Sequence, residues 1–373
     1  MKHPNHLKTI LALFQVFGIL LVTQPEISGQ SKDRAIEFPD IPGFLTLKCD
    51  FHMHSVLSDG SVWPNIRVEE AKRDGLHAIS LTDHIEYQPH RNDIPHADRN
   101  LGFQLTRMAA EGSNLMIING AEITRSMPPG HFNAIFIQDV NKLKQDDVME
   151  VFKEANQQQA FVFWNHPHWT AQQPDGIATL DEIHLKLISE GLIHGIEIFN
   201  EDTYSEEALQ IALEHNLTIL GNSDIHGLVD WQFNVAEGGH RPTTLVFAAD
   251  KTTDAIRDAL FMRRTAVWFD NTLVGASEFL VPLVQESLEV ERLEKALVER
   301  LIIHNHSDAS YIMENHSEFN LHNQASVFTL PAHTSTLIQV KTVQELDSYL
   351  LRFSVLNAIT APGKHPEIIL EIK

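Results

Sequence analysis

Short apolar runs alternate with amphipathic stretches from about residue 44 to about residue 270. The apolar runs have the length of strands, and the stretches between them have the spacing of helices that bury one face. The predicted strands are Phe44–Phe51, His77–Leu81, Leu115–Ile123, Phe132–Ile137, Phe161–Trp164, Gly195–Phe199, Thr218–Leu220 and Thr244–Phe247. The predicted helices are Asn65–Asp74, Leu101–Glu111, Asp146–Gln158, Leu180–Glu190, Ser205–His215 and Thr253–Met262. This alternation predicts an α/β fold, a parallel sheet with right-handed crossovers that closes into an irregular (βα) barrel.

The pattern changes after about residue 275. The charged stretch Leu280–Glu299 is interpreted as a helical connector. Strand-like runs separated by Asn, Ser, Asp, Gly and Pro follow it at Leu301–His304, Tyr311–Glu314, Ser326–Leu330, Thr336–Lys341, Tyr349–Ser354 and Ile368–Ile372. They predict a small all-β, sandwich-like C-terminal domain over residues 276–373, after a barrel over residues 44–275.

The first residues of the chain have the pattern of a targeting segment. Lys2 and Lys8 precede an apolar stretch from Ile10 to Val22, and small residues follow at Ser28-Gly29. The stretch is short for a membrane span, so residues 1–29 are predicted to be a signal peptide, with a periplasmic or secreted protein as the consequence. An uncleaved anchor is the alternative, and no other membrane element is expected.

Net charge limits the possible partners, and cysteine content limits the possible disulfide bonds. The formal net charge of −22 argues against a nucleic-acid partner, because phosphate backbones attract Lys and Arg. It still allows a small phosphate-containing substrate if metal ions reverse the local charge. The single cysteine, Cys49, excludes an internal disulfide and is interpreted as a core residue. The sequence does not indicate an oligomeric state.

Histidine and carboxylate side chains gather where the predicted strands end. His52 and His54, two residues apart at the end of the first strand, point to the same face. Similar groups at other strand ends are Asp83-His84, Glu122, His131, His166 with His168, and Asp224 with His226. In a barrel these groups converge on one cavity, where they would repel one another or remain desolvated without a cation. The sequence therefore predicts a metal centre.

The chemistry of these donors narrows the choice of metal. Imidazole and carboxylate without thiolate suit Zn, Mn or Fe better than Ca or Mg alone. Asp50 and Asp83 are interpreted as groups that orient the ligand histidines from behind, although each could be a ligand or a local cap instead.

Together the motifs His52-x-His54, Asp83-His84, Glu122, His131, His166-Pro167 and Asp224-x-His226 resemble those of the PHP (polymerase and histidinol phosphatase) family. The resemblance implies a distorted seven-stranded (βα) barrel, two or three divalent metal ions and hydrolysis of phosphoesters. It implies three overlapping ligand sets, which are His52, His54, Glu122 and Asp224; Glu122 with His131 and His166; and Asp59, His84 and His226. The leader segment and β domain further resemble an exported phosphodiesterase subgroup.

Two further residues are candidates for catalysis. Arg125 could form a bidentate contact with a phosphate oxygen, and an ordinary solvated arginine is the alternative. His168 could protonate the leaving oxygen, and a partly exposed histidine beside Trp169 is the alternative. Trp169 is a candidate for the pocket wall, whereas Trp164 and Phe199 fit core packing better.

These observations predict a hydrolase in which a metal-activated hydroxide cleaves a small or organic phosphodiester. Few Lys or Arg residues occur at the predicted strand ends, which favours a diester over the more highly charged monoester. Two alternatives stay open: a phosphomonoesterase of the histidinol-phosphatase type, and an exported binding module whose barrel is a relic.

Overall fold

The computed structural model of the chain describes residues 34–322 and 324–373. The predicted signal peptide lies outside these residues, so both it and the predicted export stay predictions. Within the described residues, no helix is both long and apolar enough to cross a membrane.

One large mixed sheet organises the first part of the chain. Its strands are β1 (Leu45–Asp50), β2 (Ala78–Leu81), β3 (Met116–Ile123), β4 (Phe132–Ile135), β5 (Phe161–Trp164), β6 (Gly195–Asn200), β7 (Thr203–Tyr204), β8 (Thr218–Asn222), β9 (Thr243–Ala248), β10 (Thr265–Phe269), β11 (Thr272–Gly275) and β19 (Ala358–Ile359). They follow the order β19-β11-β10-β9-β1-β2-β3-β4-β5-β6-β7, and β8 pairs with the free side of β6. The eight predicted strands are all present, and β7, β10, β11 and β19 are additions that the sequence analysis missed.

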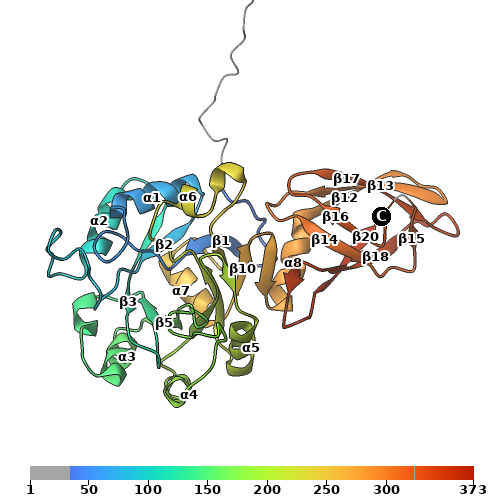
Figure 1. Ribbon diagram of the computed structural model, residues 1–373. Helices are drawn as coiled ribbons and strands as arrows, with labels where there is room; N and C mark the ends of the chain where they lie inside the picture. The colour runs from blue at the N-terminus through green and yellow to red at the C-terminus, as the bar shows by residue number, and fades with distance from the viewer. Residues whose placement is uncertain (1–33, 323) are drawn as a thin grey trace, which may run out of the picture. The chain divides into compact units, whose positions relative to one another are not determined.

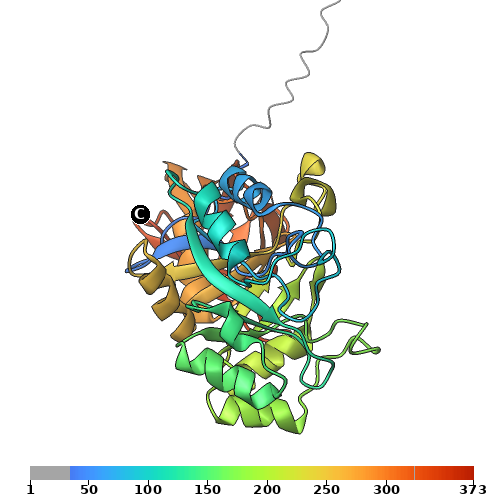
Figure 2. The same ribbon diagram turned by 90° about the vertical axis from the view of Figure 1, so that its left-hand side faces the viewer.

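Helices surround the curved sheet (Figures 1 and 2). They are α1 (Pro64–Arg73), α2 (Leu101–Ala109), α3 (Val148–Gln157), α4 (Glu182–Ser189), α5 (Glu206–His215), α6 (Val229–Gln232), α7 (Thr253–Phe261) and α8 (Ser277–Ser287), with 3₁₀ turns η1 (Val140–Leu143) and η2 (Val235–Glu237). Local sequence sets their ends. At the start of α5, the Ser205 hydroxyl accepts a hydrogen bond from the amide of Ala208, and at its end Asn216 takes the left-handed conformation.

Strand direction departs from the predicted all-parallel sheet. β1, β2 and β3 are parallel, as are β5, β6 and β8, but β4 runs antiparallel to both β3 and β5. β9 likewise runs antiparallel to β1. Only residues 124–131 separate β3 from β4, which is too few for the crossover that a parallel pair needs.

The sheet curls back on itself so that β8 approaches β9 and β10. Threonine side chains, rather than a continuous backbone ladder, close this seam. The Thr244 hydroxyl of β9 donates to the Gly221 carbonyl at 2.8 Å and accepts from the Gly221 amide at 3.1 Å. Thr265 of β10 donates to the Ile219 carbonyl at 2.7 Å. A side chain at Gly221 would meet Val267 at 2.2 Å, so only glycine allows this approach. In this form the predicted distorted barrel is confirmed.

The C-terminal part is the predicted all-β domain. One four-stranded sheet contains β12 (Leu288–Glu294), β13 (Val298–Asn305), β17 (Ser335–Lys341) and β15 (Asn320–Leu321); the other contains β16 (Val327–Leu330), β14 (Tyr311–Asn315), β18 (Tyr349–Val355) and β20 (Glu367–Ile372). The predicted helix over Leu280–Glu299 is wrong beyond Ser287. Leu288 and Val290 alternate with glutamates there, which is the period of a strand.

Candidate metal centre

All nine predicted metal donors lie at one edge of the barrel sheet. His52 and His54 follow β1, His84 follows β2, and Glu122 is near the end of β3. His131 precedes β4 in sequence. Because β4 runs antiparallel to β3 and β5, its start lies at the same edge of the sheet as the ends of those two strands. His166 and Asp224 follow β5 and β8 and have positive φ angles of 29° and 47°. Such angles are uncommon outside glycine and here turn the chain directly after a strand.

Isolated backbone bridges fix the loops that carry these donors. Met53 pairs with Ile225, which places the two histidines after β1 beside Asp224. His84 pairs in the same way with Glu122. In the first loop, the Gly60 amide donates to the Ser55 carbonyl at 2.9 Å, and a side chain at Gly60 would lie 2.7 Å from backbone atoms. The loop therefore depends on glycine at this position.

The deepest cluster consists of two imidazoles and two carboxylates. His52 Nε2 lies 3.1 Å from His54 Nε2. Glu122 Oε2 lies 3.3 and 3.2 Å from these two nitrogens, and Asp224 Oδ1 lies 3.1 and 2.9 Å from them. A tetrahedral ion with bonds of about 2.0–2.1 Å to N and O ligands sets its donors about 3.3 Å apart, so this donor set fits a transition-metal ion.

Buried donor atoms crowded against one another give further support for this fit. Glu122 Oε1, Asp224 Oδ1 and His131 Nδ1 are buried and face other donors of the cluster, with Asp224 Oδ1 2.9 Å from His54 Nε2 and Glu122 Oε1 2.7 Å from His131 Nδ1. Crowded buried donors are costly without a cation, and an ion in each group would satisfy them.

A second group forms around the other oxygen of Glu122. Glu122 Oε1 lies 2.7 Å from His131 Nδ1 and 3.7 Å from His166 Nε2. Donor atoms of His84, Glu122 and His131 come within 4.8 Å of one another. Glu122 thus stands between two groups, as the family resemblance implied for a bridging carboxylate, while the pairing of His131 with His166 on one ion stays a prediction.

A third group is the most exposed of the three. Asp59 lies 3.3 Å from both His84 Nε2 and His226 Nε2, through its two oxygens. These three residues and His54 offer atoms within 4.8 Å of one another. The His226 side chain is 35% exposed, whereas the His52 and His54 side chains are fully buried, so the centre runs from the barrel interior to its mouth.

Hydrogen bonds to the second ring nitrogen orient three histidines, and they fix the tautomers of His52 and His226, whose partners can only accept. His52 Nδ1 donates to Glu197 at 2.9 Å, and His226 Nδ1 donates to the Asp224 carbonyl at 2.7 Å. His84 Nδ1 bonds the Thr124 hydroxyl at 2.6 Å. Each contact leaves Nε2 free to face the donor groups, which is the usual arrangement around metal-binding histidines.

Close packing of acids and imidazoles moves their pKa values in opposite directions. Burial by itself raises the pKa of Glu122 and Asp224, but neighbouring histidines outweigh it and hold both carboxyl pKa values well below their usual range. Burial alone lowers the pKa of His54, and hydrogen bonds with Asp224 and Glu122 raise it to about 10. The cluster thus attracts positive charge at the position where the donors converge.

The orienting groups differ from those predicted. Asp83 accepts from the Ser55 amide and hydroxyl and from the Ser58 hydroxyl, while Asp50 accepts from the Ser223 hydroxyl at 2.5 Å. Neither side chain forms a hydrogen bond or ion pair with a ligand imidazole, so they position loops rather than rings.

Arg241 is a buried residue that the sequence analysis missed. It pairs with Asp50 at 3.0 Å and with Asp74 at 2.7 Å in the fully buried interior.

Glu197 on β6 is the orienting carboxylate that the sequence analysis missed. It is fully buried, and besides His52 it accepts from the His166 amide at 2.9 Å, Asn200 at 2.8 Å and Asn222 at 2.9 Å. A glutamate inside the apolar run Gly195–Phe199 was the available signal, because a charge at a buried strand position needs partners.

The two predicted catalytic residues have partners of their own. Arg125 pairs with Glu86 and donates to the carbonyls of Thr124 and Gln145, so the contacts do not favour a free phosphate clamp. His168 Nε2 bonds the Thr203 hydroxyl at 2.8 Å, and burial, then His166, lowers its pKa. Both roles stay predictions.

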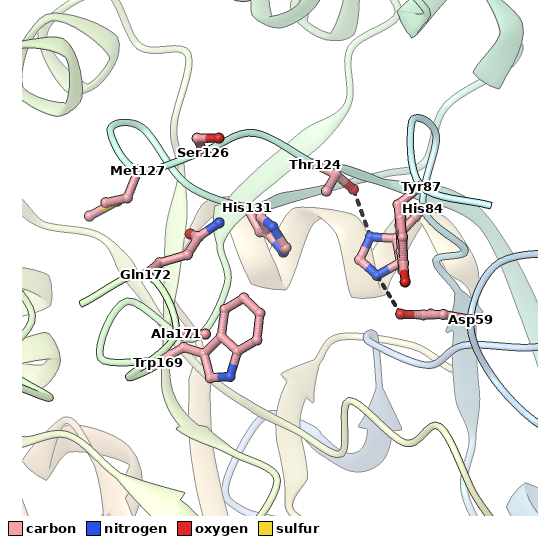
Figure 3. A pocket seen from close by; sticks show the side chains of 10 residues that line it. All are labelled: Asp59, His84, Tyr87, Thr124, Ser126, Met127, His131, Trp169, Ala171 and Gln172. Carbon is pink, nitrogen blue, oxygen red and sulfur yellow. Dashed lines mark hydrogen bonds and ion pairs between the residues drawn. The ribbon is translucent and has the colours of Figure 1, made fainter. Parts of the chain in front are cut away.

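A cavity of about 520 Å³ opens beside the second and third groups (Figure 3). Asp59, His84 and His131 form one part of its wall, and Trp169 and Tyr87 stand nearby. Polar lining comes from Thr124, Ser126 and Gln172 and apolar lining from Met127 and Ala171. The described lining contains no lysine or arginine, so bound cations would have to balance an anionic ligand.

Known proteins match both parts of this architecture. A family model described as PHP domain matches residues 50–229, and one described as Ig-like domain matches residues 287–371. A crystal structure from Bacteroides vulgatus, of a two-domain protein containing a predicted PHP-like metal-dependent phosphoesterase, is 42% identical and gives a TM-score of 0.86. The match covers 92% of this chain and all of that one.

More distant matches are weaker in both sequence and structure. PsfC from Pseudomonas syringae is 17% identical over 60% of this chain and 91% of its own, with a TM-score of 0.41. No curated protein matches the chain.

The class that fold and site define is a PHP-type barrel joined to an Ig-like domain. The chain belongs to the PHP family, as its close match over nearly its full length shows. The predicted domain limits, 44–275 and 276–373, enclose the two matches, and their exact positions stay predictions.

Proposed function

We propose that the protein is a metal-dependent phosphodiesterase for a small or organic phosphodiester. The observation that carries the proposal is the convergence of His52, His54, Glu122 and Asp224 at tetrahedral spacing in a buried cluster. The relative from Bacteroides vulgatus, described as containing a metal-dependent phosphoesterase, supports the reaction class.

The chain's own groups divide the work. The three donor groups would hold two or three divalent ions, of which Zn, Mn and Fe suit the donor chemistry. Such ions supply an acidified water and positive charge for the phosphoryl oxygens. Glu197 holds His52 in the ligating tautomer, Thr124 orients the ring of His84, and burial of the deepest cluster keeps bulk water from competing for its donors.

The lining of the cavity supports a diester over a monoester. A monoester carries one more negative charge near neutral pH and needs further cationic donors. Among the residues that the structure describes, no lysine or arginine lines the cavity, and Arg125 is paired with Glu86. The same lining leaves room for an uncharged ester group, for which Thr124, Ser126 and Gln172 offer polar contacts. A signal peptide at residues 1–29 would place this activity in the periplasm or outside the cell.

The test is hydrolysis of bis(p-nitrophenyl) phosphate by protein loaded with Zn, Mn or Fe. Asp224→Asn keeps the side-chain shape and removes the charge, so we expect at least a hundredfold loss of kcat/KM together with a lower metal content. Asp146→Asn, at an exposed aspartate, is the matched control and should behave as wild type. A metal-loaded wild type that hydrolyses no phosphoester would favour the binding-module alternative, and full activity in Asp224→Asn would refute the assigned site.

A further inference from the structure

Two exposed aromatic side chains stand at the cavity beside the candidate metal donors. The Trp169 residue is 45% exposed and Tyr87 is 52% exposed, although both are large apolar side chains. Figure 3 shows the indole near His131 and the phenol beside His84. Exposed aromatic rings at a concave site commonly provide contact surface for a ligand.

Each ring is held against the metal donors. The Trp169 ring lies 5.7 Å from the ring of His131 and 5.2 Å from that of His166, at interplanar angles of 52° and 67°. The Tyr87 ring lies 5.8 Å from His84 at 76°. An ester substituent on a phosphate bound at the metal centre would therefore contact these rings directly.

Backbone contacts fix the position of Trp169. Its amide donates to the His166 carbonyl at 2.9 Å, and its carbonyl accepts from the amides of Gln172 and Gln173 at 2.9 and 2.8 Å. The turn that carries the indole is thus joined to the turn that carries a donor. A ring held in this way can contact a ligand with little loss of conformational entropy.

The rest of the lining selects against charge on the substituent. Met127 and Ala171 complete an apolar surface, and the described part of the chain contributes no lysine or arginine to pair with an anion. Among the described lining residues Asp59 is the one carboxylate, and it already faces His84 and His226. A cationic substituent would therefore find aromatic faces without a free counter-charge.

We propose that Trp169 and Tyr87 select phosphodiesters in which one ester group carries a flat, uncharged ring. This inference rests on the proposed phosphodiesterase function and specifies its substrate class. The metal centre holds the phosphate, and the two aromatic side chains receive the ring. Trp169 makes the main contact because its indole is the larger face and is fixed by the turn.

The test compares methyl benzyl phosphate with methyl cyclohexylmethyl phosphate, followed by ³¹P NMR. Both have alkyl leaving groups, and they differ in whether the ring is flat. We expect wild type to prefer the benzyl ester about tenfold in kcat/KM, and Trp169→Leu to reduce this ratio to about twofold. Trp169→Phe, which keeps a flat ring, should retain most of the preference. Trp231→Leu, at a 78% exposed tryptophan outside the lining, is the matched control and should keep the wild-type ratio.

A binding measurement separates this inference from the proposed function. Benzylphosphonate should bind metal-loaded wild type about tenfold more tightly than cyclohexylmethylphosphonate by calorimetry, a difference of about 1.4 kcal/mol. Equal hydrolysis of both diesters would overturn the ring preference and leave the phosphodiesterase proposal standing. Hydrolysis of neither diester would refute the proposed function, and the phosphonate ratio would then decide the ring site alone.

Two further outcomes bear on the proposal: a Trp169→Leu protein that does not fold, and a preference for a cationic ester. If Trp169→Leu does not fold, Tyr87→Leu at the exposed phenol provides the test and should lower the ratio by a factor of two or more. A methyl phosphodiester of choline that outperforms the benzyl ester would overturn the proposal in favour of a cation-binding cage.

Discussion

Replacing Glu197 by glutamine should weaken metal binding without unfolding the protein. Glutamine has nearly the same shape, so the packing of β6 is preserved, but one carboxylate oxygen becomes an amide group that can only donate. Glu197 Oε1 accepts from His52 Nδ1 and Asn222, and Oε2 accepts from the His166 amide and Asn200. Whichever end becomes the amide therefore faces two former donors.

The two orientations have different costs. With the amide beside His52, the imidazole can respond by moving its proton to Nε2, the nitrogen that faces Glu122 and Asp224, and this tautomer cannot bind a metal through that atom. With the amide beside His166, a backbone amide and Asn200 lose their acceptor. An unsatisfied buried group costs about 1–3 kcal/mol. Loss of an orienting partner typically lowers metal affinity about 10- to 100-fold, or about 1.4–2.8 kcal/mol.

Calorimetric titration of the metal-free protein with Zn or Mn measures this change, and circular dichroism reports the fold. Glu111→Gln, at an exposed glutamate on the surface, is the control and should bind metal as wild type does. A folded Glu197→Gln protein that binds every metal equivalent within twofold of wild-type affinity would refute the role assigned to Glu197.

Further outcomes follow from the site and from one buried histidine. Elemental analysis after loading with Zn, Mn or Fe should find two or three ions per chain, and less than one would contradict the donor assignment. In matched aryl esters the diester should have the higher kcat/KM, and a tenfold advantage for the monoester would establish the phosphatase alternative. Burial, then Lys48 and Lys251, lowers the pKa of His77 to about 4, from about 6.5 when unfolded, so the unfolded chain binds more protons between these values and stability falls as pH falls through them. Linkage with these two values gives roughly 2 kcal/mol between pH 6.5 and 4.5, and solvent screening of the half-buried side chain reduces it. His77→Asn should therefore reduce the loss of unfolding free energy over this range by about 1 kcal/mol, and an unchanged profile in chemical denaturation would contradict this.

Sequence alone located most of the site because the family motifs occur where apolar runs end. His52-x-His54, Glu122 and Asp224 each adjoin a run whose length and composition indicate a buried strand, and such ends meet at one edge of a barrel. Local pattern was therefore sufficient to bring the donors together. How they divide among ions depends on distances of a few ångströms, which no pattern specifies.

The features that were missed depend on tertiary contacts. Arg241 lies far along the chain from Asp50 and Asp74, and only the closed sheet brings the three together. The direction of β4 was readable in principle from the short segment 124–131, which cannot contain a crossover. Glu197 was readable only as a charge in an apolar run, and its partner His52 could not be identified without the fold.

The pairing of β19 with β11 joins a strand inside the Ig-like match, residues 287–371, to the barrel sheet that precedes this match in the chain. Leu273 and Val274, both fully buried, lie opposite Ala358 and Ile359 near the end of the chain. A fragment that stopped at residue 275 would leave the outer edge of the apolar strand β11 unpaired, and such an edge is a template for association with other chains. During synthesis on the ribosome, this edge of β11 stays unpaired until residue 359 has emerged. The barrel sheet therefore cannot be completed until β19 has been made, and the Ig-like domain supplies this last strand.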